Sequence, residues 1–376
     1  MDVQPSGITM KVDSSLRDVR PVILGAVVRG VSLPDDSEGC EAFIKGLMDH
    51  QEKLHFALGR RRQRASIGVH DLARLAPPFH VKTVGEKHAF VPLAREESMT
   101  IADILTQHPK GIEFAGLLAD TTSYPLIVDA DDAVLSFPPI INGDHTTVTH
   151  NTRDFFIDVT GWDERACEAS LMLVCLQLIQ WGGQVESVEI TTCEGDRIVS
   201  PIGTGKTHVV PEELVQNLLG RAFTDDELQV AVQRMGGRFE GRQPAPNDAP
   251  DHSTSMAVAR AGTSELLFTM PRWRFDLLHP VDMVEELAIG HGYEDLGTDV
   301  PKATLTAQPR TDHHLRRRLR ASMEGMGMMQ IQSLTLSNMD DQFVRMRWKP
   351  NHAVTTITNP ITVDHTVLRQ HLMPGL

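Results

Sequence analysis

The sequence is short of cysteine, and it lacks any long apolar run. Its 376 residues include four Cys, none of them in a C-x-x-C pair. This pattern argues against a disulfide scaffold or a Cys-based zinc site and favours a reduced setting. The most apolar run, residues 171–181, is too short to cross a bilayer and carries two Gln. No targeting segment is visible, and we predict a cytoplasmic protein without membrane contact.

Positive charge is also scarce. Lys and Arg number 36 against 50 Asp and Glu, which gives a formal net charge of -14. This charge argues against a surface that is basic all over, as in general nucleic-acid binding, so any RNA contact must come from a local patch. Arg60, Arg61, Arg62 and Arg64 form one such run. It is either a phosphate-binding patch or a solvated charge run, and the run alone does not decide.

Length and patterning predict a multidomain α+β chain, because about 150 residues per domain is usual. We expect an α+β domain over residues 1–205, with one long apolar helix over residues 163–181. A small α/β domain is expected over residues 206–298. A third domain begins at residues 299–376 with a basic helix and a strand, and its last segment is expected to be helical.

Residues 201–207, "PIGTGKT", partly match a phosphate-binding loop. The P-loop pattern is G-x-x-x-x-G-K-[ST], and Ser200 stands where its first Gly belongs. The motif must also lead directly into a helix whose N–H groups hold phosphate. The residues that follow have extended character, so we interpret this segment as a domain linker.

Four carboxylates are crowded into one short stretch. If Pro280 opens a helix, Asp282, Glu285 and Glu286 share one face of it, with Asp276 just before. The helix dipole stabilises acids in a first turn, which accounts for Asp282 but not for Asp276. Like charges at this spacing call for a cation, and a set of oxygen ligands favours Mg²⁺ or Ca²⁺ over zinc. Spacing alone leaves the dipole and metal interpretations open.

The sequence shows no recognisable catalytic triad. His55, His70 and His80 are scattered without metal-ligand spacing, and we interpret them as ordinary polar positions. No Ser or Cys nucleophile follows the pattern of a strained elbow between strand and helix. The residues by themselves indicate a multidomain cytosolic protein and leave its reaction undefined.

Five separated segments resemble the β subunit of phenylalanyl-tRNA synthetase. The acidic stretch, "MPRWRFDLLHPVDMVEELAIGHGYEDL", carries the family pattern P-x-x-R-x-D, then D-x-x-E-E, then G-Y. The other four resemble the archaeal and eukaryotic form, occur in its order and cover nearly the whole chain. They are "LHFALGRRRQRASIGVHDL", "LSFPPIIN", "FFIDVTG" and "NPITVDHTVLRQHLMPGL".

The resemblance implies a partner, a cofactor and a fold. The family works as an α₂β₂ heterotetramer that charges tRNA-Phe using ATP and Mg²⁺, with the activation chemistry in the α subunit. The implied Mg²⁺ ligands are Asp276, Asp282, Glu285 and Glu286, in a site shared with the α subunit. The implied fold is an α+β editing domain, a small winged-helix-like domain that bears the metal, and the start of a class II synthetase-like antiparallel sheet domain.

The resemblance also implies that residues 1–205 hydrolyse tyrosine wrongly attached to tRNA-Phe. Such a second site is needed because a pocket for Phe cannot strongly reject an added hydroxyl. Ser136, Asn142, Asp158 and Thr160 match the editing pocket. Asn142 and Asp158 would bond the Tyr hydroxyl or the ester, and a water would be the nucleophile. The plainer alternative is that Ser136 and Thr160 satisfy strand ends and Asp158 caps a turn.

The chain matches the middle of the family pattern. The family's N-terminal domain and the rest of its catalytic-like domain are not in the sequence, so we expect an internal piece of a longer reading frame or a truncated product. Two other functions stay open: a stand-alone aminoacyl-tRNA deacylase, and a non-catalytic module that binds RNA or a partner subunit.

Overall fold

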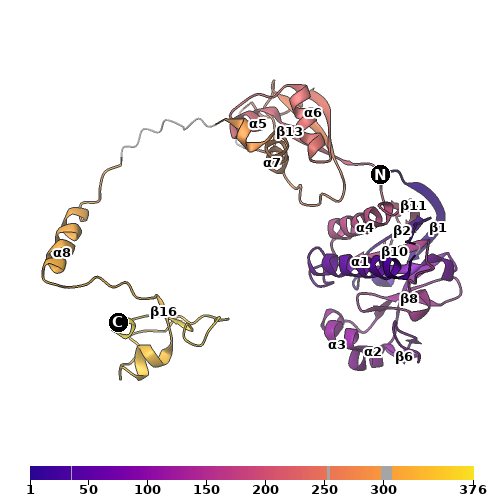
Figure 1. Cartoon of the computed structure of the whole chain (residues 1–376), viewed down its shortest axis with the longest axis horizontal. Coiled ribbons are helices and arrows are strands. Elements are labelled where there is room, and N and C mark those ends of the chain that lie inside the picture. The colour runs from indigo at the N-terminus through magenta and orange to yellow at the C-terminus, as the bar shows by residue number, and fades with distance from the viewer. Residues whose placement is uncertain (35, 252–254, 298–306) are drawn as a thin grey trace. The chain divides into compact units, whose positions relative to one another are not determined.

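The computed structural model describes residues 1–34, 36–251, 255–297 and 307–376. They form two compact units, Met1–Thr298 and Asp299–Leu376 (Figure 1). Both helices and largely antiparallel sheets are present, so the predicted multidomain α+β class is confirmed. The predicted division of the first unit at residue 205 stays a prediction. In the described part of the chain, no helix is long and apolar enough to cross a membrane.

A ten-stranded sheet organises the first 200 described residues. Its strand order is β3-β10-β2-β11-β1-β4-β7-β8-β9, and β12 pairs with β11. The antiparallel pair β7–β8 is the hairpin that two apolar runs around a "DADD" turn favour. The strands are β1 (Gln4–Val12), β2 (Val22–Arg29), β3 (Ala65–Asp71), β4 (Phe79–Val84), β7 (Tyr124–Val128), β8 (Val134–Phe137), β9 (Ile141–Asn142), β10 (Phe155–Gly161), β11 (Gln184–Thr191) and β12 (Arg197–Ser200).

Two helices cover one face of this sheet: α1 (Ser37–Phe56) and α4 (Glu164–Ile179), as Figure 1 shows. Helix α4 is the predicted long apolar helix, and Asp163 caps its N-terminus. Because side chains alternate along a strand, Ile157 of β10 packs with these helices and Phe156 packs in the core on the other face. Asp158 has the same parity as Phe156, which directs its side chain away from α4.

A smaller group of elements packs beside β7 and β8. It consists of β5 (Ala89–Phe90), β6 (Met99–Thr100), α2 (Ile101–Gln107) and α3 (Pro109–Phe114). Its core joins apolar residues of α2 to the inward side chains of β7 and β8. Pro109 stands in the first turn of α3, where its missing N–H is tolerated. This group forms one side of the cavity described below.

The second part of this unit has a three-stranded sheet of order β13-β15-β14 and three helices around one core. Thr224 and Glu227 form a capping box at the start of α6. Strand β13 begins at Lys206, within the "GTGKT" segment, so the helix that a P-loop requires does not follow. The elements are β13 (Lys206–Pro211), α5 (Glu212–Leu219), α6 (Asp225–Arg234), β14 (Arg238–Pro244), β15 (Ser264–Met270), α7 (Pro280–His291) and the 3₁₀ turn Tyr293–Leu296.

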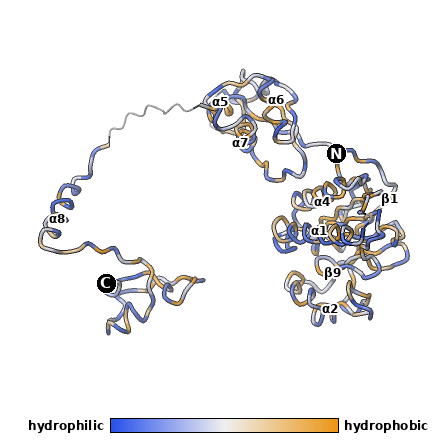
Figure 2. Tube along the Cα trace, viewed as in Figure 1, coloured by the Kyte–Doolittle hydropathy of each residue, from blue (hydrophilic) through white to orange (hydrophobic). Residues whose placement is uncertain are grey.

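The Asp299–Leu376 unit contains the predicted basic helix, α8 (His313–Gly325), whose residues are mostly hydrophilic in Figure 2. In residues 307–376 its sheet is a single antiparallel pair, β16 (Leu336–Ser337) with β17 (Val367–Leu368). The expected helix at the end of the chain is wrong, because residues 359–376 hold β17 and a 3₁₀ turn, Met373–Gly375. Pro360 and the β-branched residues after it disfavour a helix there. The class II-like sheet itself stays a prediction.

Candidate functional site

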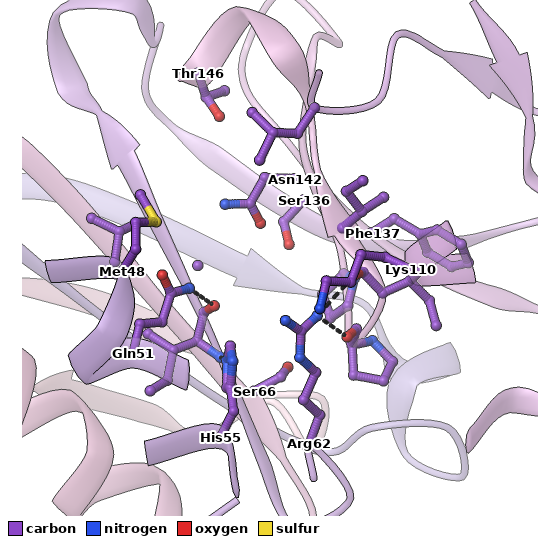
Figure 3. A pocket seen from close by; sticks show the side chains of 18 of the residues that line it. Met48, Gln51, His55, Arg62, Ser66, Lys110, Ser136, Phe137, Asn142 and Thr146 are labelled. Carbon is purple, nitrogen blue, oxygen red and sulfur yellow. Dashed lines mark hydrogen bonds between the residues drawn. The ribbon is translucent and has the colours of Figure 1, made fainter. Parts of the chain in front are cut away.

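A cavity of about 600 Å³ lies between helix α1, strand β3 and the connection from β8 to β9. Ser136, Asn142 and Asp158 all contribute to its wall. Figure 3 shows Ser136 and Asn142 next to each other, with Gln51 and His55 of α1 across the opening. The remaining wall is mainly apolar, with side chains such as Ile44 and Phe137.

Backbone pairing brings Ser136 and Asn142 together. They are directly opposite in the short β8–β9 ladder, which places both side chains on the same face. Arg62 fixes the connection between these strands, since its Nη1 donates to the carbonyl of Ile140 at 2.9 Å. Its Nη2 donates to Glu52 of α1 at 2.7 Å. One buried guanidinium therefore holds two walls of the cavity in register.

Asp158 reaches the cavity through a gap left by a glycine. Its Oδ2 lies 2.7 Å from Nε2 of His70, and both side chains are buried. Gly68 pairs with Asp158 across the β3–β10 ladder. A Cβ at Gly68 would overlap Asp158 Oδ2 and lie 2.6 Å from His70 Nε2. Glycine is needed at this position because the aspartate–histidine pair occupies the space of a side chain.

Thr160, the fourth predicted residue, does not lie in the cavity wall. Its hydroxyl accepts a hydrogen bond from Nε of Arg20 at 2.7 Å, and its carbonyl accepts one from Nη2 at 2.8 Å. Burial lowers the pKa of Arg20 to about 10, so this guanidinium stays charged at neutral pH. The structure thus brings Ser136, Asn142 and Asp158 to one cavity and places Thr160 behind it, on a buried cation. The catalytic role of all four stays a prediction.

His55 lines the cavity but has no nitrogen left for proton transfer. Its Nε2 accepts the N–H of Ile67 at 2.8 Å, so the ring proton is on Nδ1, which faces Glu52 at 3.2 Å. Burial lowers the pKa of His55, which keeps the ring neutral at pH 7. The hydrogen bond from His55, with the nearby Arg62 charge, lowers the pKa of Glu52 to about 2. This group therefore supports the wall and is not a proton acceptor.

The basic run of residues 60–64 divides into two roles. Arg60, Arg61 and Arg62 have left-handed backbone φ angles of 46°, 54° and 65°, which are costly for residues with a Cβ. Arg60 and Arg61 are exposed, whereas Arg62 is buried and its guanidinium lies 4.4 Å from the ring centre of Phe114. The run is therefore neither a uniform phosphate patch nor a uniformly solvated stretch, because Arg62 belongs to the cavity wall.

The predicted metal ligands surround an arginine. Pro280 opens α7 as expected. Nη1 of Arg274 donates to Glu286 at 2.7 Å, and its Nη2 donates to Asp276 at 2.7 Å. The hydrogen bond to Glu286, followed by that to Asp276, raises the pKa of Arg274, and the Arg274 hydrogen bond lowers the pKa of Asp276. Asp282 caps α7 by accepting the N–H groups of residues 278 and 279, each at 2.7 Å, and Glu285 is exposed.

This arrangement does not fit a resident Mg²⁺. In the described ranges, no group of three or more His, Cys, Asp or Glu side chains converges as metal ligands would. The guanidinium stands between Asp276 and Glu286, where an ion would need to bind. Asp282 has one oxygen committed to the start of the helix. The assignment of these four acids to Mg²⁺ stays a prediction.

Sequence reasoning missed His70, Arg20 and Arg62, which the structure places around the predicted residues. His70 looked ordinary because its partner is 88 residues away in the sequence. A local signal was present: Gly68 interrupts a buried strand at the position where an adjacent side chain needs space. For Arg20 and Arg62, the sequence alone gave no sign of burial.

Comparison with known proteins agrees with this architecture. Three family models match: the B3/4 domain over residues 25–174, the tRNA synthetase B5 domain over residues 209–293, and the phenylalanyl tRNA synthetase beta chain CLM domain over residues 296–376. Ser136, Asn142 and Asp158 of the cavity lie inside the first, as does Thr160 behind it, and helix α7 lies inside the second. These matches define the class, a chain built from the domains of an aminoacyl-tRNA synthetase.

Individual relatives narrow the class. The chain is 36% identical to the phenylalanine–tRNA ligase beta subunit of Methanococcoides burtonii over all of its own length and 65% of the relative's. It is 35% identical to that of Archaeoglobus fulgidus, covering 97% of this chain and 62% of the relative. The crystal structure of an N-terminal fragment of the phenylalanyl-tRNA synthetase beta-subunit from Pyrococcus horikoshii matches with a TM-score of 0.65 and 31% identity, over 78% of this chain and 77% of that one.

The chain belongs to the archaeal-type family of phenylalanyl-tRNA synthetase β subunits. It spans less than two thirds of the length of the curated relatives named above. The resemblance predicted from the five motifs is thereby confirmed.

Proposed function

We propose that the cavity hydrolyses the ester of a misacylated tRNA and releases tyrosine from tRNA-Phe. The observation that carries this proposal is the convergence of Ser136, Asn142 and Asp158 on one cavity of about 600 Å³. That volume lies in the range of small-ligand sites, and a few polar groups in a mainly apolar wall are typical of a specific pocket. An amino-acid side chain of the size of tyrosine fits such a space.

Selectivity for tyrosine follows from the polar groups. A site built to hydrogen-bond a hydroxyl discriminates strongly against the analogue that lacks it, because its own polar groups are then left unpaired. Asn142 offers both a donor and an acceptor, and Ser136 lies opposite it in the ladder. These two residues bind the phenol or the ester carbonyl. Phenylalanine, without the hydroxyl, leaves one of them unsatisfied.

The reaction needs a water molecule and a proton acceptor. The water oxygen attacks the ester carbonyl carbon and its proton passes to the Asp158 carboxylate. The carbon–oxygen bond to the ribose then breaks, and Asp158 returns the proton to the ribose oxygen as it leaves. One water is consumed, and the products are free tyrosine and deacylated tRNA. His55 is not a candidate for this role, since both its ring nitrogens are engaged.

The test is hydrolysis of Tyr-tRNA-Phe and of Phe-tRNA-Phe by the purified 376-residue chain. Faster release of tyrosine supports the proposal. Equal rates for the two esters contradict the proposed selectivity, and no release from either contradicts hydrolysis by this chain. The variant Ser136→Ala tests the cavity residue. Its matched control is Ser123→Ala, because Ser123 is an exposed serine outside the cavity.

We further propose that the chain works as the β subunit of a cytoplasmic phenylalanine–tRNA ligase, with an α subunit in an α₂β₂ assembly that uses ATP and Mg²⁺ to charge tRNA-Phe. Family membership supports this role. Mixing the chain with an α subunit and measuring ATP-dependent phenylalanylation tests it. Charging above the level of the α subunit alone supports it, and no gain on mixing contradicts it for this chain.

The stand-alone deacylase has one observation in its favour. All residues that line the cavity fall between Ile44 and Asp158, so its wall needs no residue from the Asp299–Leu376 unit. Hydrolysis by the chain without an α subunit would agree with this alternative. Binding of tRNA-Phe without hydrolysis would instead favour a non-catalytic interaction module.

A further inference from the structure

We infer that His70 is a positioning residue for the hydrolytic site: it holds one oxygen of Asp158 so that the other is presented to the cavity as the proton acceptor. This inference rests on the proposed function for its chemistry. Its structural part, the orientation of the Asp158 carboxylate by His70, can be tested without any hydrolysis.

The His70 ring is fixed on three sides. It is fully buried in strand β3. Nδ1 lies 2.8 Å from Oγ1 of Thr146, and Nε2 lies 2.7 Å from Oδ2 of Asp158. Phe156, two residues before Asp158 on β10, is stacked with the ring at a centroid distance of 6.1 Å and an interplanar angle of 28°. A ring held at both nitrogens and by a stacked neighbour has one orientation available.

The two ends of this chain of hydrogen bonds both reach the cavity. Thr146 and Asp158 belong to its wall, whereas His70 lies behind them. In the described residues, Oδ1 of Asp158 receives no hydrogen bond from protein. It is also not among the fully buried polar atoms left without a partner in that part of the chain. Oδ2 is therefore committed to His70, and Oδ1 is available to a water in the cavity.

The partner of the Thr146 hydroxyl decides which nitrogen of His70 carries a proton. If the Thr146 hydroxyl donates to Nδ1, the His70 proton is on Nε2 and is donated to Oδ2. If that hydroxyl donates instead to the carbonyl of Gly143, 3.0 Å away, Nδ1 carries a proton, and Nε2 donates to Oδ2 only when the ring holds a second proton. The positioning contact requires a proton on Nε2, which the ¹⁵N measurement below reports. Oδ1 then accepts the proton of the attacking water, while His70 keeps its Nε2 proton.

The arrangement is that of a general base oriented by a third group. A carboxylate free to rotate would offer either oxygen to the buried histidine or to water. Fixing Oδ2 removes this freedom before substrate binds, which is the usual contribution of a supporting hydrogen bond to catalysis. Gly68 takes part indirectly, because any side chain at its position would displace the Asp158–His70 pair.

The experiment compares His70→Gln with His70→Met in the full chain. Gln retains an N–H that can reach Oδ2, and Met has similar size without a donor. We expect His70→Met to lower kcat for Tyr-tRNA-Phe by about 10²-fold or more, within the range assigned to general-base catalysis, with KM changed less than about threefold. We expect His70→Gln to retain kcat within about tenfold of the unaltered chain.

Three results would overturn the inference. Equal losses of kcat in the two variants would show that the N–H donor is irrelevant. A change confined to KM would place His70 in substrate binding. Losses that parallel the thermal unfolding temperature of each variant would reduce His70 to a packing residue. Thr146→Val provides a milder variant, since it removes only the bond at Nδ1 and leaves the donor to Asp158.

A spectroscopic measurement separates this inference from the proposed function. The ¹⁵N chemical shifts of the His70 ring report which nitrogens carry protons. A protonated Nε2 whose signal changes in Asp158→Asn supports the positioning contact even if the chain hydrolyses neither ester, in which case the proposed function alone fails. An unprotonated Nε2 overturns the inference whether or not the chain is active.

Discussion

The negative charge of the carboxylates is compensated differently at two sites in this chain. Asp158 is buried against His70 with one oxygen bonded and, among the described residues, the other left for the cavity. At the start of α7, Arg274 donates to both oxygens of Asp276 and to both oxygens of Glu286. Asp158 therefore keeps an oxygen available to the cavity, whereas both oxygens of Asp276 and of Glu286 are bonded to Arg274. Several acids close together in a sequence therefore indicate that a cation is needed there. They do not indicate that any of these acids takes part in a reaction.

The physical reason is the identity of the partner. A guanidinium is planar, carries five N–H donors, and matches a carboxylate in a two-pronged geometry. One Arg between two acids can therefore occupy every oxygen. An imidazole ring donates in the direction of one nitrogen and reaches one oxygen only. The first arrangement stabilises structure, and the second leaves an oxygen for chemistry.

The largest effect that separates the two sites is expected from Asp158→Asn. The amide keeps the shape but cannot accept a proton, so kcat for Tyr-tRNA-Phe should fall by about 10²–10⁴-fold. Single-turnover hydrolysis measures this change. The matched control is Glu285→Gln, an exposed acid of the crowded site, for which we expect the rate of the unaltered chain. Full activity of Asp158→Asn would remove the distinction between the sites.

Arg274→Met is the corresponding test at α7. It leaves Glu286, whose side chain is 8% exposed, beside Asp276 without a counter-charge. We expect a loss of about 3 kcal/mol in the free energy of unfolding, the lower end of the range for a broken buried pair. Urea denaturation measures it. The double variant Arg274→Met/Glu286→Gln should recover a large part, because the stranded charge is then gone.

The control for this variant is Arg17→Met, which removes an arginine from an exposed pair with Glu194. Exposed pairs contribute little, so no clear change in the urea midpoint is expected. Equal destabilisation by the two arginine variants would mean that Arg274 acts by general charge and not by its contacts with Asp276 and Glu286.

The two sites also differ in how far the sequence predicts them. Helix α7 follows local rules: Pro280 begins it and Asp282 caps it, so its position and acidic face are readable from spacing. The spacing predicts a metal ion as the compensating cation, whereas the positive charge beside Asp276 and Glu286 in the structure is that of Arg274, two residues before Asp276. Spacing gives the side of a helix on which a residue lies, but it does not give the direction in which a side chain before the helix folds back.

The cavity depends on long-range pairing, which spacing does not encode. The alternation of "FFIDVTG" predicts that Asp158 and Thr160 share a face of β10, and they do. Which of them reaches the cavity depends on neighbours from elsewhere, His70 for Asp158 and Arg20 for Thr160, at 88 and 140 residues along the sequence. The family resemblance predicts that Asp158 and Thr160 belong to the site. The register of the strands determines which of the two reaches the cavity.

Glu52→Gln should produce a smaller effect, visible as a pH dependence. The pKa of Glu52 is about 2, against its ordinary value of 4.5, so the folded state favours the ionised form. Its stabilisation is therefore complete above about pH 4.5 and is lost as the pH falls toward 2. The effect is modest, because the side chain is 52% exposed and solvent screens its pairs.

Acid unfolding of the unaltered chain and of Glu52→Gln measures this contribution. The two stabilities should differ most near neutral pH and converge as the pH approaches 2. A constant difference across this range would assign the effect of the substitution to packing in the wall of the cavity. The contacts of Glu52 with His55 and Arg62 would then not stabilise its charge in the way that Arg274 stabilises the charges of Asp276 and Glu286.

The smallest effect is expected from Mg²⁺. Because Arg274 occupies the oxygens of Asp276 and Glu286, addition of Mg²⁺ or its removal with a chelator should leave the unfolding free energy of the chain unchanged. An ion at 100 times its dissociation constant would add about 2.7 kcal/mol, so urea denaturation would detect it. Stabilisation that disappears in Asp282→Asn and in Glu285→Gln would restore the metal site predicted from the sequence. Arg274 would then have to move aside, and the contrast between a saturated and an available carboxylate would hold only in the absence of the ion.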